Sequence, residues 1–404
     1  MFGDVFRRYL HWADKVGTED GLSGAQTLSL IEKCVRSPDL DPEEIAALLS
    51  AASEEENRKV ILDFAARYKR PHNREILLLP PLYFSSICEN RCQYCDFSAS
   101  GKRLSLEEFR REFRALLKRG YRSIELVSGQ DPGLFVHRKP FDLSRQAYDI
   151  EGAAAYFRIA REELDQNGGG MVTSNIPPVD GESLGRLRDN GLDCYLSWVE
   201  TFDPAQYARL HNPRGPKINQ AFRLNAYERA REAGIPHVAG AFLKGLSDWK
   251  KEEFLLYFLD SHLRRKTGRG FSIIGTPRIK GSFCSSPLIS GTAMSDDDYE
   301  LNIALDRILF DGILWLQTRE TPSLNRSLIN RYGGGIILTP DCSTAPGGYS
   351  RPTSATPQFP VYRQNVKTAV GRLEADGFEV RYAWDAGTLA SFRRDRPAKK
   401  DFES

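Results

Sequence analysis

The chain has 404 residues, of which 41% are hydrophobic and 27% charged, with 33 Gly and 22 Pro. This composition is close to the average for globular proteins and excludes a disordered, collagen-like or coiled-coil chain. The 56 basic and 54 acidic residues leave a net charge of +2, so no long-range field favours nucleic acid or an acidic membrane surface as a partner. The length fits two or three domains, or one large α/β barrel with extensions.

No stretch of about 18 uninterrupted apolar residues occurs, so we expect no membrane-spanning helix. The N-terminal segment has neither the apolar run nor the small-residue cleavage site of a signal peptide. Seven cysteines, an odd and sparse number for this length, do not predict a disulfide framework. We therefore expect a cytoplasmic protein with no membrane and no nucleic-acid partner.

Residues 1–75 show apolar positions at helical spacing and predict a helical N-terminal extension. Within it, Asp41-Pro42-Glu43-Glu44 has the cap, the proline and the acidic first turn of a helix start. After residue 75, short runs rich in branched and aromatic residues alternate with amphipathic segments, which is typical of βα units. The predicted strands are 76–84, 123–128, 170–175, 194–199, 238–243, 271–276, 312–318 and 334–338. The predicted helices between and after them are 105–119, 150–166, 182–190, 217–233, 249–265, 295–309, 322–330 and 363–373.

Eight strands with intervening helices fit an α/β fold of the (βα)8 TIM-barrel type, with an open doubly wound sheet plus a second domain as the alternative. We divide the chain into the N-terminal helical extension (1–75), the barrel (76–342) and a short C-terminal extension of loop and helix (343–404). In such barrels the loops that follow the strands build the functional mouth. Chemistry-bearing residues at strand ends are therefore the candidates for a site.

The strongest local signal is the run Cys88-Glu-Asn-Arg-Cys92-Gln-Tyr-Cys95, directly after the first predicted strand. Three thiolates on one short loop can hold a soft metal, but a tetrahedral zinc site would require a fourth Cys or His nearby. The nearest histidines in sequence, His72 and His137, do not have a zinc-finger spacing. Three cysteines with an open fourth position instead suit an iron–sulfur cluster that leaves one iron for an outside ligand.

This C-x3-C-x-aromatic-C run after the first strand resembles the signature of the radical S-adenosylmethionine (SAM) enzymes, with Tyr94 in the aromatic place. The resemblance implies that Cys88, Cys92 and Cys95 ligate a 4Fe–4S cluster and that SAM binds its unique iron. It also implies that one electron from the reduced cluster generates a 5′-deoxyadenosyl radical. The cofactor then carries the chemistry, while the protein positions it and excludes water.

Over residues 55–350 the chain resembles one branch of that family, the aromatic amino acid lyases, whose members include the 2-iminoacetate synthase ThiH and the hydrogenase maturase HydG. The branch cleaves the Cα–Cβ bond of tyrosine to p-cresol and dehydroglycine (2-iminoacetate). A C-terminal C-x2-C pair, which HydG uses for a second cluster, does not occur after Cys342, so the ThiH-like reaction is favoured. The matching segments include Glu200-Thr-Phe202, His211-Asn-Pro-Arg-Gly-Pro-Lys217, Arg223-Leu224, Thr276-Pro-Arg278, Thr318-Arg-Glu320 and Ser343-Thr-Ala-Pro-Gly-Gly-Tyr349.

Four residues are expected to bind the cofactor. Glu200, just past the fourth predicted strand, points into the mouth, and the resemblance gives it the ribose hydroxyls or the ammonium group of SAM. Arg223 is expected to bind the SAM carboxylate as a two-pronged donor, with a solvated arginine as the alternative. Tyr94 packs on the adenine or the cluster, or in the core. Gln130 stands where the family usually has a Glu that holds the SAM ammonium, a departure that removes a charge-assisted hydrogen bond unless Asp131 compensates.

Three residues are expected to meet the substrate. By resemblance, Thr276 and Arg278 at the end of the sixth strand bind the carboxylate of the amino acid, with an internal acid as the alternative partner of Arg278. Arg319, after the seventh strand, is expected to be a second contact to that carboxylate or to the cofactor. A small-residue run of the branch is replaced by Leu338-Thr-Pro-Asp-Cys342. This last loop closes the barrel near the substrate, so the change leaves open which amino acid the enzyme accepts.

The sequence thus predicts a radical SAM carbon–carbon lyase acting on a free aromatic amino acid, tyrosine first and tryptophan second. The altered residues Gln130 and 338–342 keep open a radical rearrangement or carbon transfer on another small amino acid. A non-catalytic iron–sulfur or zinc-binding protein is the alternative of another class. The implied partners are the small-molecule substrate, reduced flavodoxin or ferredoxin as electron donor, and a downstream enzyme that captures the imine, which water hydrolyses readily.

Overall fold

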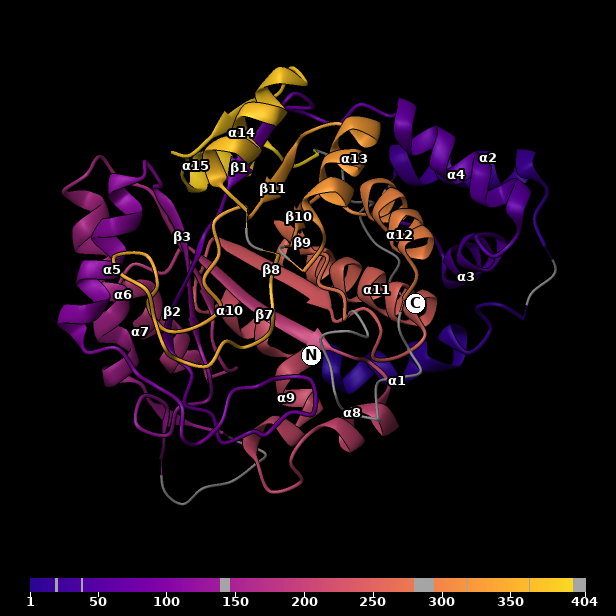
Figure 1. Cartoon of the computed structure of the whole chain (residues 1–404). Helices are drawn as coiled ribbons and strands as arrows, with labels where there is room; N and C mark the ends of the chain where they lie inside the picture. Colours follow the sequence, from indigo (N-terminus) through magenta and orange to yellow (C-terminus); the bar gives the residue numbers. More distant parts are fainter. Residues whose placement is uncertain are drawn as a thin grey trace.

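The computed structural model describes residues 1–18, 21–37, 39–138, 146–279, 294–317, 319–362 and 364–394. A curled parallel sheet lies at the centre of the molecule and helices surround it (Figure 1). This arrangement confirms the predicted α/β fold class. The strands of the sheet are β1 (Glu75–Leu78), β2 (Pro81–Ser85), β3 (Ser123–Ser128), β6 (Met171–Asn175), β7 (Cys194–Glu200), β8 (His237–Phe242), β9 (Ile273–Gly275), β10 (Ile313–Leu316), β11 (Ile336–Leu338) and β12 (Glu379–Arg381).

The run of barrel strands begins and ends in one segment of chain. From β2 the order runs through β3, β6, β7, β8, β9, β10 and β11 to β1, and β1 and β2 are separated only by Leu79 and Pro80. The first half of segment 75–85 pairs in parallel with β11 and the second half with β3. Because one kinked segment has neighbours on both sides, the eight predicted strands form a ring of the TIM type.

Helices that follow the strands cover the outside of the ring. Their starts carry the expected caps: Ser105 forms a capping box with Glu108, and Ser295 accepts a hydrogen bond from the Asp298 N–H. The predicted helix 217–233 is interrupted, because Asn219 and Asn225 each start a new helix. The outer helices are α5 (Leu106–Lys118), α6 (Glu151–Asp165), α7 (Gly181–Asp189), α8 (Pro204–Leu210), η1 (Pro216–Ile218), α9 (Gln220–Leu224), α10 (Ala226–Glu232), α11 (Trp249–Thr267), α12 (Asp296–Leu309) and α13 (Pro322–Tyr332).

The N-terminal extension is helical, as predicted. It consists of α1 (Phe2–Ala13), α2 (Gly24–Arg36), α3 (Pro42–Ala51) and α4 (Glu55–Arg67), which lie against α11 and α12 on one side of the molecule (Figure 1). At the predicted helix start, Pro42 occupies the first turn and Glu44 accepts a hydrogen bond from the Asp41 N–H at 3.0 Å. The backbone N–H of Phe2 donates to Glu228 of α10 at 2.6 Å, which fastens the start of the chain to the barrel.

The C-terminal segment closes the end of the ring at which the strands begin. It comprises α14 (Val366–Ala375), β12 and α15 (Ala386–Ser391), and β12 pairs with β1 on the side away from β11. Trp384, Leu389 and Phe392 pack with the inward side chains of the strands. Of this segment only the helix was predicted. A plug at the N-terminal ends of the strands leaves the C-terminal ends as the open mouth.

The remaining strands β4 (Val136–His137) and β5 (Tyr148–Asp149) form a small antiparallel ribbon after β3. None of the helices in the described ranges is long and apolar enough to span a membrane.

Candidate active site at the mouth of the barrel

A cavity of about 1050 Å³, including its open entrance, lies at the C-terminal ends of the strands. Its wall comes from the loops that follow β2, β3, β6, β7, β10 and β11, as expected for a barrel of this type. Aromatic side chains contribute much of its lining, among them Tyr83, Trp198, Trp315 and Phe359. Indole rings from opposite sides of the barrel meet there, since the ring centroids of Trp198 and Trp315 are 5.9 Å apart.

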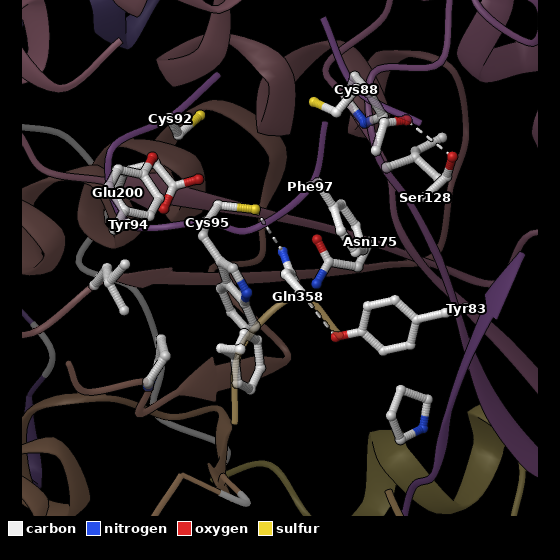
Figure 2. A pocket seen from close by; sticks show the side chains of 18 of the residues that line it. Tyr83, Cys88, Cys92, Tyr94, Cys95, Phe97, Ser128, Asn175, Glu200 and Gln358 are labelled. Atoms are coloured by element: carbon white, nitrogen blue, oxygen red, sulfur yellow. Dashed lines mark hydrogen bonds between the residues drawn. The ribbon is translucent and has the colours of Figure 1, made fainter. Parts of the chain in front are cut away.

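Cys88, Cys92 and Cys95 follow β2 and all line this cavity. The loop that carries them is held by its own backbone: the Cys88 N–H donates to the Ser98 carbonyl at 2.9 Å and the Cys95 N–H to Cys92 at 3.2 Å. Figure 2 shows the three sulfur atoms turned toward a shared space. The structure therefore brings together the three predicted ligands.

The three thiols surround a space larger than that around a single ion. Among the described residues, no group of three or more His, Cys, Asp or Glu side chains is arranged to hold one metal ion. Burial raises the pKa of Cys95 to about 12, and the neighbouring Cys92 adds to the shift. The three thiols are thus close enough to influence one another, but they are not spaced as tightly as the ligands of a tetrahedral zinc ion. This spacing fits a multinuclear iron–sulfur cluster.

Tyr94 extends from the cysteine loop to a histidine. Its hydroxyl lies 2.6 Å from Nε2 of His211, and Nδ1 of His211 donates to the Tyr207 carbonyl at 2.7 Å. Burial lowers the pKa of His211 to about 2, and Lys217 and Arg223 contribute to the shift. The imidazole is therefore neutral, and its free Nε2 accepts the hydrogen bond from Tyr94.

Gln130 lies beside the first cysteine. Its backbone N–H points at the Cys88 sulfur at 3.4 Å, its Oε1 accepts from Asn90 at 3.1 Å, and its Nε2 donates to the Tyr148 hydroxyl at 3.2 Å. A side chain on Gly129 would come within 2.5 Å of the Ile87 carbonyl, so glycine allows the two loops to approach.

Asp131 does not take the place of the missing glutamate. Its carboxylate is fully buried and bound to Arg103, through Nε at 2.7 Å, and to the Ser85 hydroxyl at 2.6 Å. The compensation that the sequence analysis left open is therefore absent in this structure.

Glu200 ends β7 in a left-handed backbone conformation, with φ of 75°, next to a register shift in its pairing with β8. Such strain in a non-glycine residue is typical of functional sites, and a strand irregularity re-aims a side chain. Oε1 of Glu200 accepts from Nζ of Lys217 at 2.6 Å, and Nη1 of Arg223 lies 3.8 Å away. Arg223 also donates to the Trp198 carbonyl at 2.8 Å. All three residues line the cavity as a buried charged group.

Thr276 and Arg278 do not line the cavity. The Thr276 hydroxyl is bound to the Tyr299 hydroxyl and to the Trp315 carbonyl, both at 2.9 Å. Arg278 is buried and forms a two-pronged ion pair with Glu320, with Nε at 2.9 Å from Oε1. The structure thus gives Arg278 the internal acid partner that was the alternative to a substrate carboxylate.

Arg319 is the arginine of the predicted substrate set that faces the cavity. Its guanidinium lies 3.6 Å from the ring centroid of Phe359. Within the described ranges it forms neither an ion pair nor a hydrogen bond. Burial lowers its pKa, yet an arginine remains charged at neutral pH. A partly buried guanidinium that faces a cavity without an ion-pair partner can bind an anion there.

Sequence reasoning missed several lining residues. Lys217 lies in a matching motif, but no role was assigned to it. Gln358, in the loop after β11, donates to the Cys95 sulfur at 3.7 Å and accepts from the Tyr83 hydroxyl at 2.8 Å (Figure 2). Glu125 and Asn175 lie on strands β3 and β6 and meet inside the barrel. An acid in the middle of a buried strand was the one signal that could have revealed Glu125.

The model of the radical SAM superfamily matches residues 82–258, which carry the cysteines, Gln130, Glu200 and Arg223. The chain carries a radical SAM domain. It is similar to 2-iminoacetate synthase of Salmonella typhimurium, with 25% identity over 393 residues that cover 94% of this chain and 96% of that protein. It is also similar to the FeFe-hydrogenase maturase HydG from Carboxydothermus hydrogenoformans, with 26% identity, a TM-score of 0.78 and coverage of 96% and 86% of the two chains.

A third relative matches over a shorter length. 3-Methylornithine synthase of Methanosarcina acetivorans is 28% identical over 212 residues, which are 50% of this chain and 53% of that protein. Together the comparisons identify a radical SAM enzyme that is homologous to 2-iminoacetate synthase and structurally close to HydG. Members of this superfamily use a 4Fe–4S cluster and S-adenosylmethionine.

The residues of the radical SAM site fit both cofactors. The three thiols provide ligands for three irons and leave the fourth iron to an outside ligand. Buried thiols lose their protons when they bind a metal, so the raised pKa of Cys95 makes cluster binding proton-coupled. The carboxylate of Glu200 and the cations of Lys217 and Arg223 provide both signs of charge beside the open side of the cysteine loop.

Proposed function

We propose that this radical SAM enzyme is a lyase that cleaves the Cα–Cβ bond of a free aromatic amino acid, tyrosine first, to p-cresol and dehydroglycine. The observation that carries the proposal is the position of Arg319. Its guanidinium lies in the same cavity as the three cysteines and forms no ion pair with the described residues. A planar two-pronged donor suits the carboxylate of an amino acid.

Aromatic walls next to that cation support an aromatic substrate. The rings of Trp198, Trp315 and Tyr83 all line the cavity and provide flat apolar surface. The indole N–H of Trp315 is already bound to the Thr339 hydroxyl at 2.7 Å, so its ring presents carbon to the cavity. A substrate held at Arg319 by its carboxylate can pack its own ring against these side chains.

When bound, the cluster and S-adenosylmethionine supply a 5′-deoxyadenosyl radical that takes a hydrogen atom from the substrate. The chain's own residues bind and shield the reactants. Arg319 holds the carboxylate, while Glu200, Lys217 and Arg223 bind polar groups of the cofactor. Gln358 and Phe359 lie over the cysteine loop, where they limit the entry of water to a reactive imine.

The test is an anaerobic assay of the reconstituted, dithionite-reduced protein with S-adenosylmethionine and a panel of amino acids. Mass spectrometry would follow 5′-deoxyadenosine, p-cresol and glyoxylate. Tyrosine is expected to give all three, and Cys92→Ser none. Deoxyadenosine without p-cresol would discard tyrosine cleavage and retain the radical chemistry. Reduced flavodoxin or ferredoxin, the expected electron donors, should replace dithionite in the same assay.

A radical rearrangement or carbon transfer on another small amino acid, such as tryptophan, is the second candidate. Two observations favour it: the match to 3-methylornithine synthase and the altered loop 338–342. Thr339 and Cys342 of that loop line the cavity, so the change lies where a substrate would bind. If the same assay gives rearranged products in place of p-cresol, the lyase proposal is wrong and this second candidate is supported.

A further inference from the structure

A buried acid lies inside the barrel, deeper than the residues discussed so far. Glu125 is in the middle of β3, three residues before the strand ends, which corresponds to ~10 Å below the rim. Its neighbours Ile124 and Leu126 face the surrounding helices, so Glu125 faces the barrel interior. The side chain lines the cavity although the residue is only 4% exposed.

Glu125 has few partners for a buried acid. Its Oε1 accepts a hydrogen bond from Nδ2 of Asn175 at 3.0 Å, and this is the one hydrogen bond of the carboxyl group within the described ranges. No basic side chain of these ranges lies within ion-pair distance. Its second oxygen, Oε2, is therefore free toward the cavity. Burying a carboxyl without partners is costly, and a ligand with a hydrogen-bond donor would remove that cost.

Two other buried acids, Glu112 and Glu252, are satisfied by the protein itself. Glu112 accepts from the backbone N–H groups of Tyr349 and Ser350, at 2.7 and 2.9 Å. Glu252 accepts from the Thr201 hydroxyl at 2.6 Å and from the Phe202 N–H at 2.8 Å. Glu125 differs from both, because its open oxygen faces the space in which a substrate would lie.

The surroundings of Glu125 favour a neutral carboxyl. Burial raises its pKa to about 8, and the hydrogen bond from Asn175 opposes this shift only in part. The nearby acids Tyr83 and Cys194 have raised pKa values through burial, so neither supplies a charge at neutral pH. A largely protonated carboxyl can both donate and accept, which suits a hydroxyl group better than a cation.

We propose that Glu125 is a specificity-determining residue that hydrogen-bonds the hydroxyl at the far end of a phenolic amino acid side chain, with Asn175 holding its carboxyl in place. This inference rests on the proposed aromatic amino acid substrate and narrows it to a phenol. Arg319 at the rim takes the carboxylate, the rings of Trp198 and Trp315 pack on the aromatic ring, and Glu125 reads the group at its tip. The matched substrate pair is therefore tyrosine and phenylalanine, which differ only in that hydroxyl.

A polar pocket of this kind discriminates strongly. A site built to bind a hydroxyl is left with an unpaired buried group when the hydroxyl is missing, and so rejects the analogue. We expect the protein to bind tyrosine at least about 10-fold more tightly than phenylalanine. Glu125→Leu removes the polar group and should reduce this ratio to within about 2-fold, whereas Glu125→Gln keeps an acceptor and should retain a preference for tyrosine.

The experiment is anaerobic titration calorimetry of reconstituted but unreduced protein with S-adenosylmethionine present, so that binding is measured without turnover. L-tyrosine and L-phenylalanine are the two probes. Glu112→Gln is the matched control, because Glu112 is equally buried but lies outside the cavity, and its ratio should equal that of the unsubstituted protein. Iron content and thermal unfolding would show that each variant is folded, and Glu125→Met repeats the test if Glu125→Leu does not fold.

The outcomes separate the two proposals. A lost preference in Glu125→Leu with a preserved one in Glu112→Gln supports the assignment. An unchanged preference in Glu125→Leu, or equal affinity for both probes in the unsubstituted protein, overturns the role of Glu125 and leaves the aromatic substrate intact. If the unsubstituted protein binds neither probe, the aromatic substrate fails, and the phenol assignment fails with it.

Discussion

The ammonium group of Lys217 lies 2.6 Å from Oε1 of Glu200, and the two side chains are only 10% and 8% exposed. Glu200 ends β7 and Lys217 follows 17 positions later in η1, so the pair joins the rim of the barrel to the segment that crosses its mouth. Burial lowers the pKa of Lys217, but the charges of Cys92 and Glu200 outweigh it and leave the pKa raised. Lys217 therefore remains charged at neutral pH.

Lys217→Met should destabilise the protein and weaken its binding of S-adenosylmethionine. The substitution leaves the carboxylate of Glu200 buried with only the more distant Arg223, at 3.8 Å, to balance it. Losing one partner of a buried ion pair costs about 3 kcal/mol of unfolding free energy. Urea unfolding of the unloaded protein measures this loss, and titration with S-adenosylmethionine measures the affinity.

Lys251→Met is the control for Lys217→Met, because Lys251 forms an exposed ion pair with Asp14 and its loss should cost below about 1 kcal/mol. An equal stability loss in both variants would contradict the importance of the buried pair.

Arg319 and Arg278 should respond to substitution in opposite ways. Arg319→Met removes a guanidinium without an ion-pair partner in the described ranges, so we expect a weaker affinity for the amino acid, by about 10-fold or more, and little loss of stability. Arg278→Met removes the described guanidinium partner of buried Glu320 and should cost about 3 kcal/mol of unfolding free energy. Tyrosine titrations and urea unfolding of both variants test the pattern. The reverse pattern would make Arg278 the substrate ligand, as the sequence resemblance implied.

Gln130→Glu should tighten binding of S-adenosylmethionine. A carboxylate at this position can keep the hydrogen bond from Asn90, and the Tyr148 hydroxyl, which donates to Gln146, can turn its proton to the new acceptor. A charge-assisted hydrogen bond to the cofactor ammonium adds about 1 kcal/mol over a neutral one, which is about 5-fold in affinity. Titration of the reconstituted protein measures it, with Gln166→Glu as a control at an exposed position outside the cavity. No change in affinity would show that residue 130 does not contact the ammonium.

The eight barrel strands were predictable because each is a short apolar run between two amphipathic helices. The plug at the N-terminal ends of the strands was not predictable. Its strand β12 has three residues and its helix α15 has six, and both are too short for a periodic pattern. Trp384 and Phe392 become part of the core only because the chain returns to β1. This contact is tertiary and has no local signature.

The site was predictable where the residues lie close together in sequence. Cys88, Cys92 and Cys95 share one loop, and a resemblance to a known motif is enough to find them. The partner of Arg278 is 42 residues away in Glu320, so the sequence could not decide between an internal acid and a substrate carboxylate. Glu125 was missed for a related reason, because strand periodicity does not show whether a buried acid meets a partner or a cavity.

The pH dependence of stability offers an independent test of how Glu125 is buried. Its pKa is about 8 in the folded protein, above the ordinary value of 4.5. Between these two pH values the folded state keeps the carboxyl proton, whereas the unfolded state has released it. The stabilisation from this proton is complete below pH 4.5 and is lost as the pH rises through 8. Between pH 5 and 8 the free energy of unfolding of the protein should therefore fall by on the order of 2 to 4 kcal/mol relative to that of Glu125→Gln, which cannot ionise.

The comparison with Glu125→Gln also removes the contribution of Glu252, another buried acid with a raised pKa, because Glu252 is present in both proteins. Urea unfolding at several pH values gives the difference, and parallel curves for the two proteins would show that Glu125 ionises freely and meets water in the cavity.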